Sequence, residues 1–388
     1  MLIAKKIKLN PTPEQEILFW KSAGTARFAY NYYLSENEKY YKEHHKLLNE
    51  GDCRKYINNV LKKTTHTWLK EVGSNVMKQA VKDANNAWKN YFKGLSDKPK
   101  FKSKHKSRPS FYVNYESLTR QNGGFHGEKI GFVKTNEPLP KLPKGQKYSN
   151  PHITYDGKYW YLSVGYEVSK KSEKLTGVSL GVDLGVKKLA ICSDGKTYKN
   201  INKTKRVKQL EKRLKREQRK LSRMMTNNIK EYKTIGKKRY PIWIRPLREC
   251  KNIQKQNNVI RLIHKKLSDI RNNYIHQTTI EIVKTKPSRI VIEDLNVKGM
   301  MKNKHLSKAV AQQKLFEFGR QIQYKSALYG IEVVKADRWY PSSKKCSCCG
   351  AIKKNLKLKD RVYRCETCGL VIDRDFNASI NLAKYKSA

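Results

Sequence analysis

Four cysteines in the C-terminal part of the chain are spaced for a metal ion. They form two Cys-x2-Cys pairs separated by 15 residues, namely Cys346, Cys349, Cys365 and Cys368. This spacing is typical of a four-thiolate zinc site, in which each pair forms one knuckle of a ribbon. A glycine follows each pair, Gly350 and Gly369, and permits a tight turn. Four protein ligands leave no open coordination position, so we expect a structural Zn²⁺ and no catalytic zinc.

The other cysteines show no such pattern. Cys348 lies between two of the expected ligands, and we set it aside because the pair around it matches the spacing of the second pair. Cys53, Cys192 and Cys250 are isolated, which favours small buried or incidental thiols over chemistry. Because five of the eight cysteines lie within residues 346–368 in metal spacing, the pattern indicates a reducing compartment rather than disulfides.

Acidic residues occur at the ends of otherwise apolar segments. Asp183 interrupts the apolar run VSLGVDLG, where a buried charge is costly unless it is paired or bound to a metal. Glu293 and Asp294 end the apolar run RIVIED, so we expect at least one of them at the edge of a sheet. Asp375 opens the last helical segment, where a helix N-terminus favours negative charge.

Three acids brought together in this way could hold two divalent cations roughly 4 Å apart for phosphodiester hydrolysis. Mg²⁺ suits such a site because it takes a few carboxylates together with phosphate oxygens. The order Asp, Glu, Asp matches the RNase H arrangement, whereas transposases of the Asp, Asp, Glu type would place Glu last. Alternatives remain open for single residues: Asp375 could be only a helix N-cap, and Asp373 or Asp294 could be neighbours that cap or are solvated.

The charge of the chain indicates a polyanionic partner. Its 388 residues include 84 Lys plus Arg and 33 Asp plus Glu, a formal net charge of +51. Such an excess would destabilise a compact state unless a polyanion neutralised it, which predicts nucleic acid. We expect no membrane partner, because no run approaches the roughly 20 apolar residues of a spanning helix. The N-terminus lacks the apolar region of a signal peptide, so we expect a cytoplasmic location.

The N-terminal half predicts a β-rich domain with inserted helices. Residues 2–9 alternate apolar and basic side chains like a half-buried strand. Thr12 begins a capping box with proline at the first helical position, and a second helix is expected from Ser74. Asp156 and Gly157 supply the turn of a hairpin between aromatic-rich strands. Residues 1–10 and 108–170 are therefore expected to share one domain, entered through the basic connection 98–108.

The C-terminal half predicts an α/β sheet. After a linker at 169–175 come a strand, a turn and a second strand within residues 178–191. Two long helices follow, with apolar seams that predict an antiparallel pair. These seams comprise Val207, Leu210, Leu214 and Leu221 in the first helix and Ile253, Ile260, Ile263, Leu267, Ile270 and Tyr274 in the second. The connection 224–246 is too polar for a core. A strand at 289–294, one helix carrying Ala311, Leu315, Phe318 and Ile322, and a strand at 331–336 complete the alternation.

The motifs also resemble those of one known family. The segments GVDLGVKKLA, VIEDLNVKGM, WYPSSKKCSCCG, YRCETCG and DRDFNASINLA, with RFAYNYYL near the N-terminus, resemble the TnpB (OrfB) family of transposon-encoded proteins. That family is similar to the type V CRISPR effectors. The resemblance extends over essentially the whole chain, and the motifs from residue 178 onward are the more specific ones.

The resemblance implies an RNA-guided DNA endonuclease. A guide RNA copied from the transposon end would pair with one strand of a double-stranded DNA target, and the protein would recognise a short target-adjacent motif. Asp183, Glu293 and Asp375 correspond to the three RuvC acids, which would hold two Mg²⁺ ions and cut both strands at one site. Cys346, Cys349, Cys365 and Cys368 correspond to the zinc ligands. One protein is expected per RNA.

The fold implied is a multidomain α/β protein with a β-barrel. Its expected parts are a wedge-like β-barrel at 1–10 and 108–170, a helical recognition lobe at 11–107, an RNase-H-like RuvC core at 176–340 and 371–388, and an inserted zinc ribbon at 341–370. The alternative function is a nuclease-inactive, RNA-guided DNA-binding repressor, as in relatives that have lost their acids. All three acids are present here, so cleavage is expected. A strand-joining transposase is disfavoured because no Tyr or Ser nucleophile motif stands out.

Overall fold

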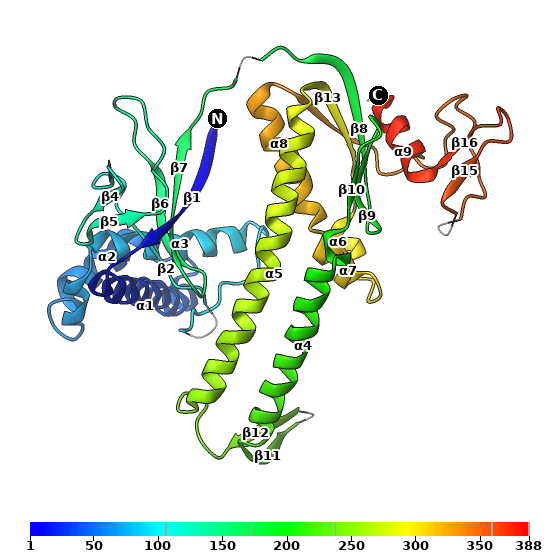
Figure 1. The fold of residues 1–388 in the computed structure, drawn as a ribbon. Helices are drawn as coiled ribbons and strands as arrows, with labels where there is room; N and C mark the ends of the chain where they lie inside the picture. Colours follow the sequence, from blue (N-terminus) through cyan, green and yellow to red (C-terminus); the bar gives the residue numbers. More distant parts are fainter. Residues whose placement is uncertain (105–106, 172, 237, 358–359, 387–388) are drawn as a thin grey trace. The chain divides into compact units, whose positions relative to one another are not determined.

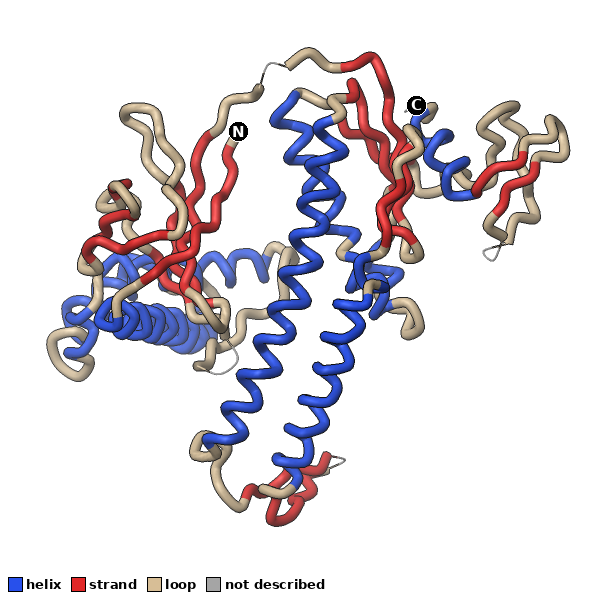
Figure 2. The backbone as a smooth tube through the Cα atoms, in the orientation of Figure 1, coloured by secondary structure: helices blue, strands red, loops and turns tan. Residues whose placement is uncertain are grey.

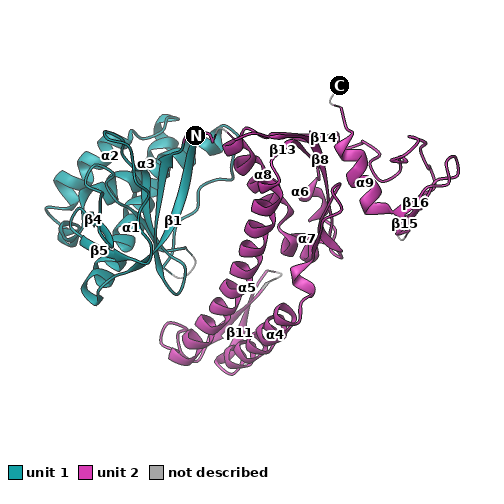
Figure 3. Ribbon diagram, turned by 45° about the horizontal axis from the view of Figure 1, so that its top comes forward, with its two compact units in different colours: residues 1–168 teal, residues 169–388 magenta. Residues whose placement is uncertain are grey.

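The protein divides into two compact units, residues 1–168 and 169–388 (Figures 1 and 3). The computed structural model describes residues 1–104, 107–171, 173–236, 238–357 and 360–386. The expected connection at 98–108 and the expected linker at 169–175 include residues 105–106 and 172, which lie outside these ranges, as do residues 358–359 of the expected ribbon. Each unit is built around its own main sheet.

A seven-stranded antiparallel sheet forms the first unit. Its order is β2-β6-β7-β1-β5-β4-β3, with bounds β1 Leu2–Asn10, β2 Ser110–Tyr112, β3 Thr119–Gln121, β4 Gly124–Gly127, β5 Gly131–Thr135, β6 Ser149–Tyr155 and β7 Trp160–Glu167. Strand β1 changes partner along its length, because residues 2–8 pair with β7 and residues 9–10 pair with β5. In the described residues β2 and β3 are edges that do not pair with each other. The sheet is therefore open, whereas we expected a barrel.

The helices of the first unit lie between β1 and β2 in the sequence. They are α1 Pro13–His44, α2 Glu50–Tyr56 with the π turn Ile57–Leu61, the 3-10 turn Thr67–Glu71, and α3 Ser74–Phe92. The capping box is confirmed, since the backbone N–H of Gln15 donates to the Thr12 hydroxyl and Thr12 N–H donates to the Gln15 side chain. Helix α1 packs against α3 and β2, with Phe19 in edge contact with Trp160 in the core.

A five-stranded mixed sheet forms the centre of the second unit. Its order is β10-β9-β8-β13-β14, with bounds β8 Thr176–Leu184, β9 Lys188–Cys192, β10 Thr197–Lys199, β13 Pro287–Glu293 and β14 Glu332–Ala336. Strands β8, β13 and β14 are parallel. Strands β9 and β10 continue the sheet in antiparallel pairs. The carboxyl ends of β8, β13 and β14 consequently meet at one edge.

Helices cover both faces of this sheet. Helices α5 Lys251–Lys284 and α8 Leu315–Tyr329 pack on one face through a core that includes Val182 and Ile292. Helix α9 Arg374–Ala383 packs on the other face, where Leu382 meets Val291 (Figure 1). Because successive strand residues point to opposite faces, Asp183 and Glu293 lie on the face of α9.

The predicted helical pair is confirmed. Helix α4 Lys205–Thr226 packs along α5, and Figure 2 shows the two helices ending at a small two-stranded sheet. That sheet is the hairpin β11 Ile229–Ile235 and β12 Lys238–Trp243, which lies in the connection that we expected only to be polar. Tyr232 and Tyr240 are each about half exposed there, 48% and 47%. The apolar seams therefore predicted the two helices, whereas the polar composition of the connection did not indicate the hairpin.

The single helix expected around residues 311–322 is instead two. Helix α7 Ser307–Gln313 ends before Lys314, which has a left-handed backbone with φ 53°, and α8 begins at Leu315. The break lets the Gln313 side chain donate to the carbonyl of Gly185 at 3.0 Å. The break therefore connects α7 to the turn that follows Asp183. The short helix α6 Val297–Met300 precedes α7.

The last strands belong to the cysteine-containing segment. Strands β15 Val362–Arg364 and β16 Val371–Asp373 form an antiparallel pair, and β16 runs directly into α9. Across the described ranges, no helix has both the length and the apolar character required to cross a bilayer.

A buried lysine joins α5 and α8. Lys325 is 5% exposed, and its ammonium donates to the carbonyl of His276 at 2.9 Å, to the Thr279 hydroxyl at 2.5 Å and to the Gln321 amide oxygen at 3.0 Å. Burial lowers the pKa of Lys325 to about 8. The protonated form of Lys325 is thus less favourable in the folded than in the unfolded chain, although its ammonium has three hydrogen-bond acceptors.

This lysine predicts a pH dependence of stability. The unfolded chain binds more protons at Lys325 than the folded chain between pH 8 and the ordinary lysine pKa of about 10.4, so stability should rise with pH over that range. We expect the free energy of unfolding of the wild type, minus that of Lys325→Met, to increase from pH 8 to pH 10 in urea titrations. A flat difference would show that the Lys325 ammonium is solvated.

Helix α9 approaches β8 more closely than a side chain allows. A Cβ at Gly181 would lie 2.0 Å from the carbonyl oxygen of Ser379 and 2.4 Å from the backbone nitrogen of Ala383. The Ser179 hydroxyl also donates to the carbonyl of Ala383 at 2.8 Å. Only glycine at this position permits the helix backbone to lie on the strand.

Substitution of this glycine should displace α9. Overpacking costs typically about 1–3 kcal/mol, and contact with backbone puts Gly181→Ala at the upper end of that range. Gly177→Ala is the matched control, because it lies in the same strand with no atom within 4 Å of its ideal Cβ. Chemical denaturation of both variants should show the loss for Gly181→Ala only. Equal stability of the two would contradict the packing of α9 on β8.

Candidate functional site

Two parallel strands bring the first two acids to one sheet edge. Val182 of β8 pairs with Ile292 of β13, so Asp183 and Glu293 each follow this pair by one residue. Their side chains are partly buried on the face covered by α9. The carboxyl end of an open α/β sheet is the usual place for a ligand.

Burial and the charges of neighbouring acids shift the pKa values of Asp183 and Glu293. Burial raises the pKa of Asp183 well above its usual range, and the charges of Glu293 and Asp375 raise it further. Burial also raises the pKa of Glu293, and Asp375 adds to the effect, while a hydrogen bond from the Ser342 hydroxyl at 2.6 Å opposes it. The three predicted acids are therefore brought within electrostatic reach of one another.

The helix N-cap is Asp373, not Asp375. The Asp373 carboxylate accepts hydrogen bonds from the backbone N–H groups of Asp375 and Phe376, each at 3.0 Å. The reading of Asp375 as a simple N-cap is therefore wrong. The Asp375 side chain is 19% exposed and instead pairs with Arg374 at 3.3 Å and Arg361 at 3.7 Å.

The side chain of Asp294 forms an ion pair outside the acid cluster. Its carboxylate pairs with Arg338 at 2.8 Å and is 38% exposed. Of the two neighbouring acids, only Glu293 therefore contributes to the cluster with Asp183. The positive charge of Arg374 acts on both acids, since it lowers the pKa of Asp183 and that of Glu293.

The donor set of this acid cluster fits hard divalent cations. Carboxylate oxygens are the ligands that Mg²⁺ takes, and buried like charges that raise each other's pKa are stabilised by a cation between them. Among the described residues the three carboxylates do not belong to a group gathered closely enough to be recognised as the site of a single ion. Carboxylates that bind two ions roughly 4 Å apart need not all contact the same ion. A wider spacing of the three acids is therefore compatible with a two-ion site.

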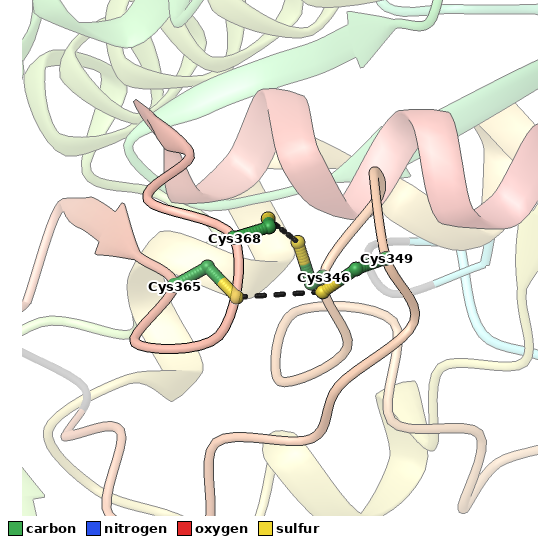
Figure 4. A group of neighbouring side chains, drawn as sticks. All are labelled: Cys346, Cys349, Cys365 and Cys368. Carbon is green, nitrogen blue, oxygen red and sulfur yellow. Dashed lines mark hydrogen bonds between the residues drawn. The ribbon is translucent and has the colours of Figure 1, made fainter.

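The four predicted cysteines form a compact cluster. The sulfurs of Cys346, Cys349, Cys365 and Cys368 all lie within 4.8 Å of one another. Figure 4 shows the four side chains meeting between two loops, with Cys346 3.6 Å from Cys368 and Cys349 3.5 Å from Cys365. Four thiolates at about 2.3 Å from one tetrahedral ion would be about 3.8 Å apart, so this cluster could hold a metal ion.

The local backbone shapes the two knuckles and favours the thiolate of Cys365. The residues after the two pairs, Gly350 and Gly369, have φ values of 81° and 73°, as the tight knuckle turns require. Backbone N–H groups of Cys368 and Thr367 lower the pKa of the Cys365 thiol to about 6. Cys348 is exposed and does not belong to the cluster.

Hydrogen bonds connect the cysteine cluster to α9. The Asn377 side chain donates to the carbonyl of Lys345 at 2.7 Å and accepts from the backbone N–H of Ser347 at 2.9 Å. The Asn381 amide donates to the same Lys345 carbonyl at 2.6 Å, and the Lys384 ammonium donates to the carbonyl of Ser347 at 2.6 Å. The first knuckle is thus tied to the helix that carries Asp375.

Sequence reasoning missed several residues that shape the acid cluster. Ser342 and Arg374 contact or influence the acids, yet a serine before a cysteine pair and an arginine between two aspartates carry no distinctive signal. Gly181 lies in the apolar run around Asp183 and was not singled out. Its position in an apolar strand, two residues before the acid, was the available signal for a close backbone approach.

Three family models match separate parts of the chain. The model described as "Cas12f1-like, TNB domain" matches residues 316–382, the OrfB model described as "Probable transposase" matches residues 163–304, and an OrfB "Helix-turn-helix domain" matches residues 1–46. In this structure residues 1–46 consist mainly of β1 and α1. The first two of these matched segments together include Asp183, Glu293, Asp375 and all four clustered cysteines.

Known proteins match nearly the whole chain. A Streptomyces pristinaespiralis protein is 28% identical over 385 residues, covering 98% of this chain and 88% of the relative. An Escherichia coli (strain K12) protein is 26% identical over 399 residues, covering 98% and 91%. Both bear the name "Putative RNA-guided DNA endonuclease", the second with the suffix InsQ. A solved structure, the cryo-EM structure of the Cas12f1-sgRNA-target DNA complex, aligns with a TM-score of 0.56 at 14% identity, covering 99% of this chain and 98% of that one.

The sheet, its helices and the structural match together define the fold of a multidomain α/β nuclease. Within that class the family models and the full-length relatives are specific. The chain is TnpB-like, similar to OrfB proteins and related to the type V effectors. The resemblance seen in the sequence motifs is confirmed.

The cysteine cluster predicts bound metal that depends on particular thiols. Cys349→Ser should lose most of the metal, because three thiolates and a hydroxyl replace the four-thiolate shell. Cys348→Ser is the matched control, one residue away and outside the cluster. Elemental analysis of the purified proteins should find about one metal ion per chain in the wild type and in Cys348→Ser. Equal metal content in Cys349→Ser would contradict the assignment of the ligands.

Proposed function

We propose that the chain is an RNA-guided DNA endonuclease. It would bind a guide RNA derived from a transposon end, recognise a short target-adjacent motif and hydrolyse both strands of a double-stranded DNA target at one RuvC-type site. The observation that carries this proposal is the cluster of three acids, in which the charges of Glu293 and Asp375 raise the pKa of the buried Asp183 and the charge of Asp375 raises that of Glu293. The names of the two relatives that match nearly the whole chain support guided DNA cleavage as the activity.

The three acids would bind two Mg²⁺ ions. When bound, such ions activate a water molecule and stabilise the leaving oxygen of a phosphodiester. The protein's own contribution is to hold the carboxylates in place. The Ser342 hydroxyl orients Glu293 through its hydrogen bond, the Asp373 cap fixes the first turn of α9, and Arg361 and Arg374 hold the Asp375 carboxylate.

The charge of the protein fits two nucleic-acid partners. The net charge of +51 would be neutralised by an RNA and a DNA target, with the release of their counterions. Helix α4 illustrates this, because its two acids are both engaged inside the protein. Glu211 pairs with Arg271 at 2.9 Å and Glu217 accepts from Gln256 at 3.0 Å, which leaves its ten Lys and Arg residues in large excess.

We assign a separate role to each of four parts of the chain. We assign the wedge-like domain to residues 1–10 and 108–170, the recognition lobe to 11–107, the RuvC-like nuclease to 176–340 and 371–388, and the ribbon to 341–370. In this assignment the ribbon holds Zn²⁺ through Cys346, Cys349, Cys365 and Cys368 and supports α9. One protein would bind one RNA.

The first test is cleavage next to a randomised flank. The protein would be co-expressed with the DNA that follows its gene, purified with its RNA and incubated with a plasmid library carrying a guide-matched site. We expect Mg²⁺-dependent linearisation beside one short motif. Asp183→Asn should reduce the rate by about 10³-fold or more, since a missing metal ligand removes several kcal/mol of transition-state stabilisation.

A matched control separates the acid cluster from general effects of charge. The control is Asp194→Asn. Asp194 lies in the turn after β9 of the same sheet, and among the described hydrogen bonds its carboxylate accepts one, from the backbone N–H of Lys196. It should cut like the wild type, and Asp183→Asn should still retain RNA. A bound, discrete RNA without any cleavage by the wild type would favour the nuclease-inactive repressor. Unchanged cutting by Asp183→Asn would refute the assigned site.

A further inference from the structure

The loop that follows β14 begins beside the acid cluster. Residues 337–342 follow Ala336, which is the residue of β14 aligned with Glu293 of β13. Because β13 and β14 are parallel, this loop leaves the sheet at the same edge as the acids. At its far end the Ser342 hydroxyl returns to Glu293 and donates to it at 2.6 Å.

Nearly every side chain of this loop is engaged in holding it. Arg338 donates to Asp294 at 2.8 Å. The Tyr340 hydroxyl donates to the carbonyl of Asn381 at 3.1 Å, and its ring contacts that of Tyr385 edge-on with 4.8 Å between centroids. The loop is therefore fixed to β13 and α9 on both sides of residue 339.

Trp339 is the exception. It is 85% exposed, more than any other large hydrophobic residue described, including Leu95 at 74% and Phe316 at 73%. Its backbone N–H donates to the Asp337 carboxylate at 2.7 Å, which closes the turn. Among the described residues no aromatic ring or cation stacks on the indole. The loop, held on both sides of residue 339, thus exposes a bare aromatic side chain three residues after the strand position aligned with Glu293.

We propose that Trp339 forms a binding subsite for an unpaired nucleobase of the strand that enters the acid cluster. The proposal rests on the proposed nuclease function and adds a positioning residue to it. An exposed indole face stacks well on a nucleobase of any sequence. In a duplex both faces of each base are covered by its neighbours, so the ring can receive only a base that has left its stack.

The position of the loop gives this subsite a purpose. A base stacked on Trp339 would fix its nucleotide relative to Glu293, because Ser342 and Arg338 tie the loop to Glu293 and to the adjacent Asp294. Holding a reacting phosphodiester in place lowers the entropy cost of the reaction. The loop thus couples capture of a single strand to alignment of its phosphate.

Binding of two short probes tests the subsite. Fluorescein-labelled ten-nucleotide oligothymidylate and an abasic strand of equal length carry the same phosphates, but only the first has bases to stack. Full-length protein with its co-purified RNA would be titrated in the Asp183→Asn background, at enough salt to suppress non-specific attraction. We expect Trp339→Ala to weaken oligothymidylate binding by about 5- to 100-fold and to leave abasic binding unchanged.

Two further variants make the result specific. Trp339→Phe keeps an aromatic face and should retain most of the affinity. Phe316→Ala, which removes another highly exposed ring at the start of α8, should bind both probes like the parent. Melting temperatures should be unchanged, because the indole packs against little. An equal loss for both probes, or no loss, would overturn the subsite.

Cleavage separates this proposal from the one on which it rests. With Asp183 restored, Trp339→Ala should raise KM for a single-stranded substrate more than Trp339→Phe does. If the wild type cuts and every variant binds and cuts alike, the subsite is refuted and the nuclease function stands. If the wild type does not cut, the nuclease function fails, and base-dependent binding lost only in Trp339→Ala still decides whether the subsite exists.

Discussion

The contact of α9 with β8 at Gly181 is the constraint on which the rest of the site depends. Asp183 and Asp375 are 192 positions apart in the sequence, and the helix that carries the second lies with its backbone against the strand that carries the first. The absence of a side chain at Gly181 sets the distance between them. Sequence spacing alone could not bring these acids together, because the approach is between two backbones.

Bringing three carboxylates together costs free energy, and the fold offsets part of it locally. Burial raises the pKa of Asp183 and of Glu293, and the charge of Asp375 adds to both effects. Ser342 and Arg374 act in the opposite direction on Glu293, through a hydrogen bond and through charge. Buried acids that are only partly neutralised are typical of functional sites, since a stable core would replace them with apolar side chains.

The sequence predicted local structure well where a residue type or spacing has few structural explanations. An aspartate in an apolar strand, two cysteine pairs with matched spacing and a capping box at Thr12 each predicted what the structure shows locally. It was less informative where tertiary contacts decide. The left-handed Lys314 splits a helix whose apolar periodicity continues through it, and Asp373 takes the cap that Asp375 could have filled. In both cases two local solutions were open, and packing selected one.

The segment between β14 and the first knuckle connects all parts of the site. It contains the exposed Trp339, then Ser342 on Glu293, and then Lys345, whose carbonyl accepts from both Asn377 and Asn381 of α9. A metal in the cysteine cluster would therefore stabilise more than the ribbon. It would restrain the knuckle, the knuckle would restrain α9 and the loop, and these carry Asp375 and the residue that orients Glu293. The geometry of the acids would therefore depend on metal binding by the four cysteines.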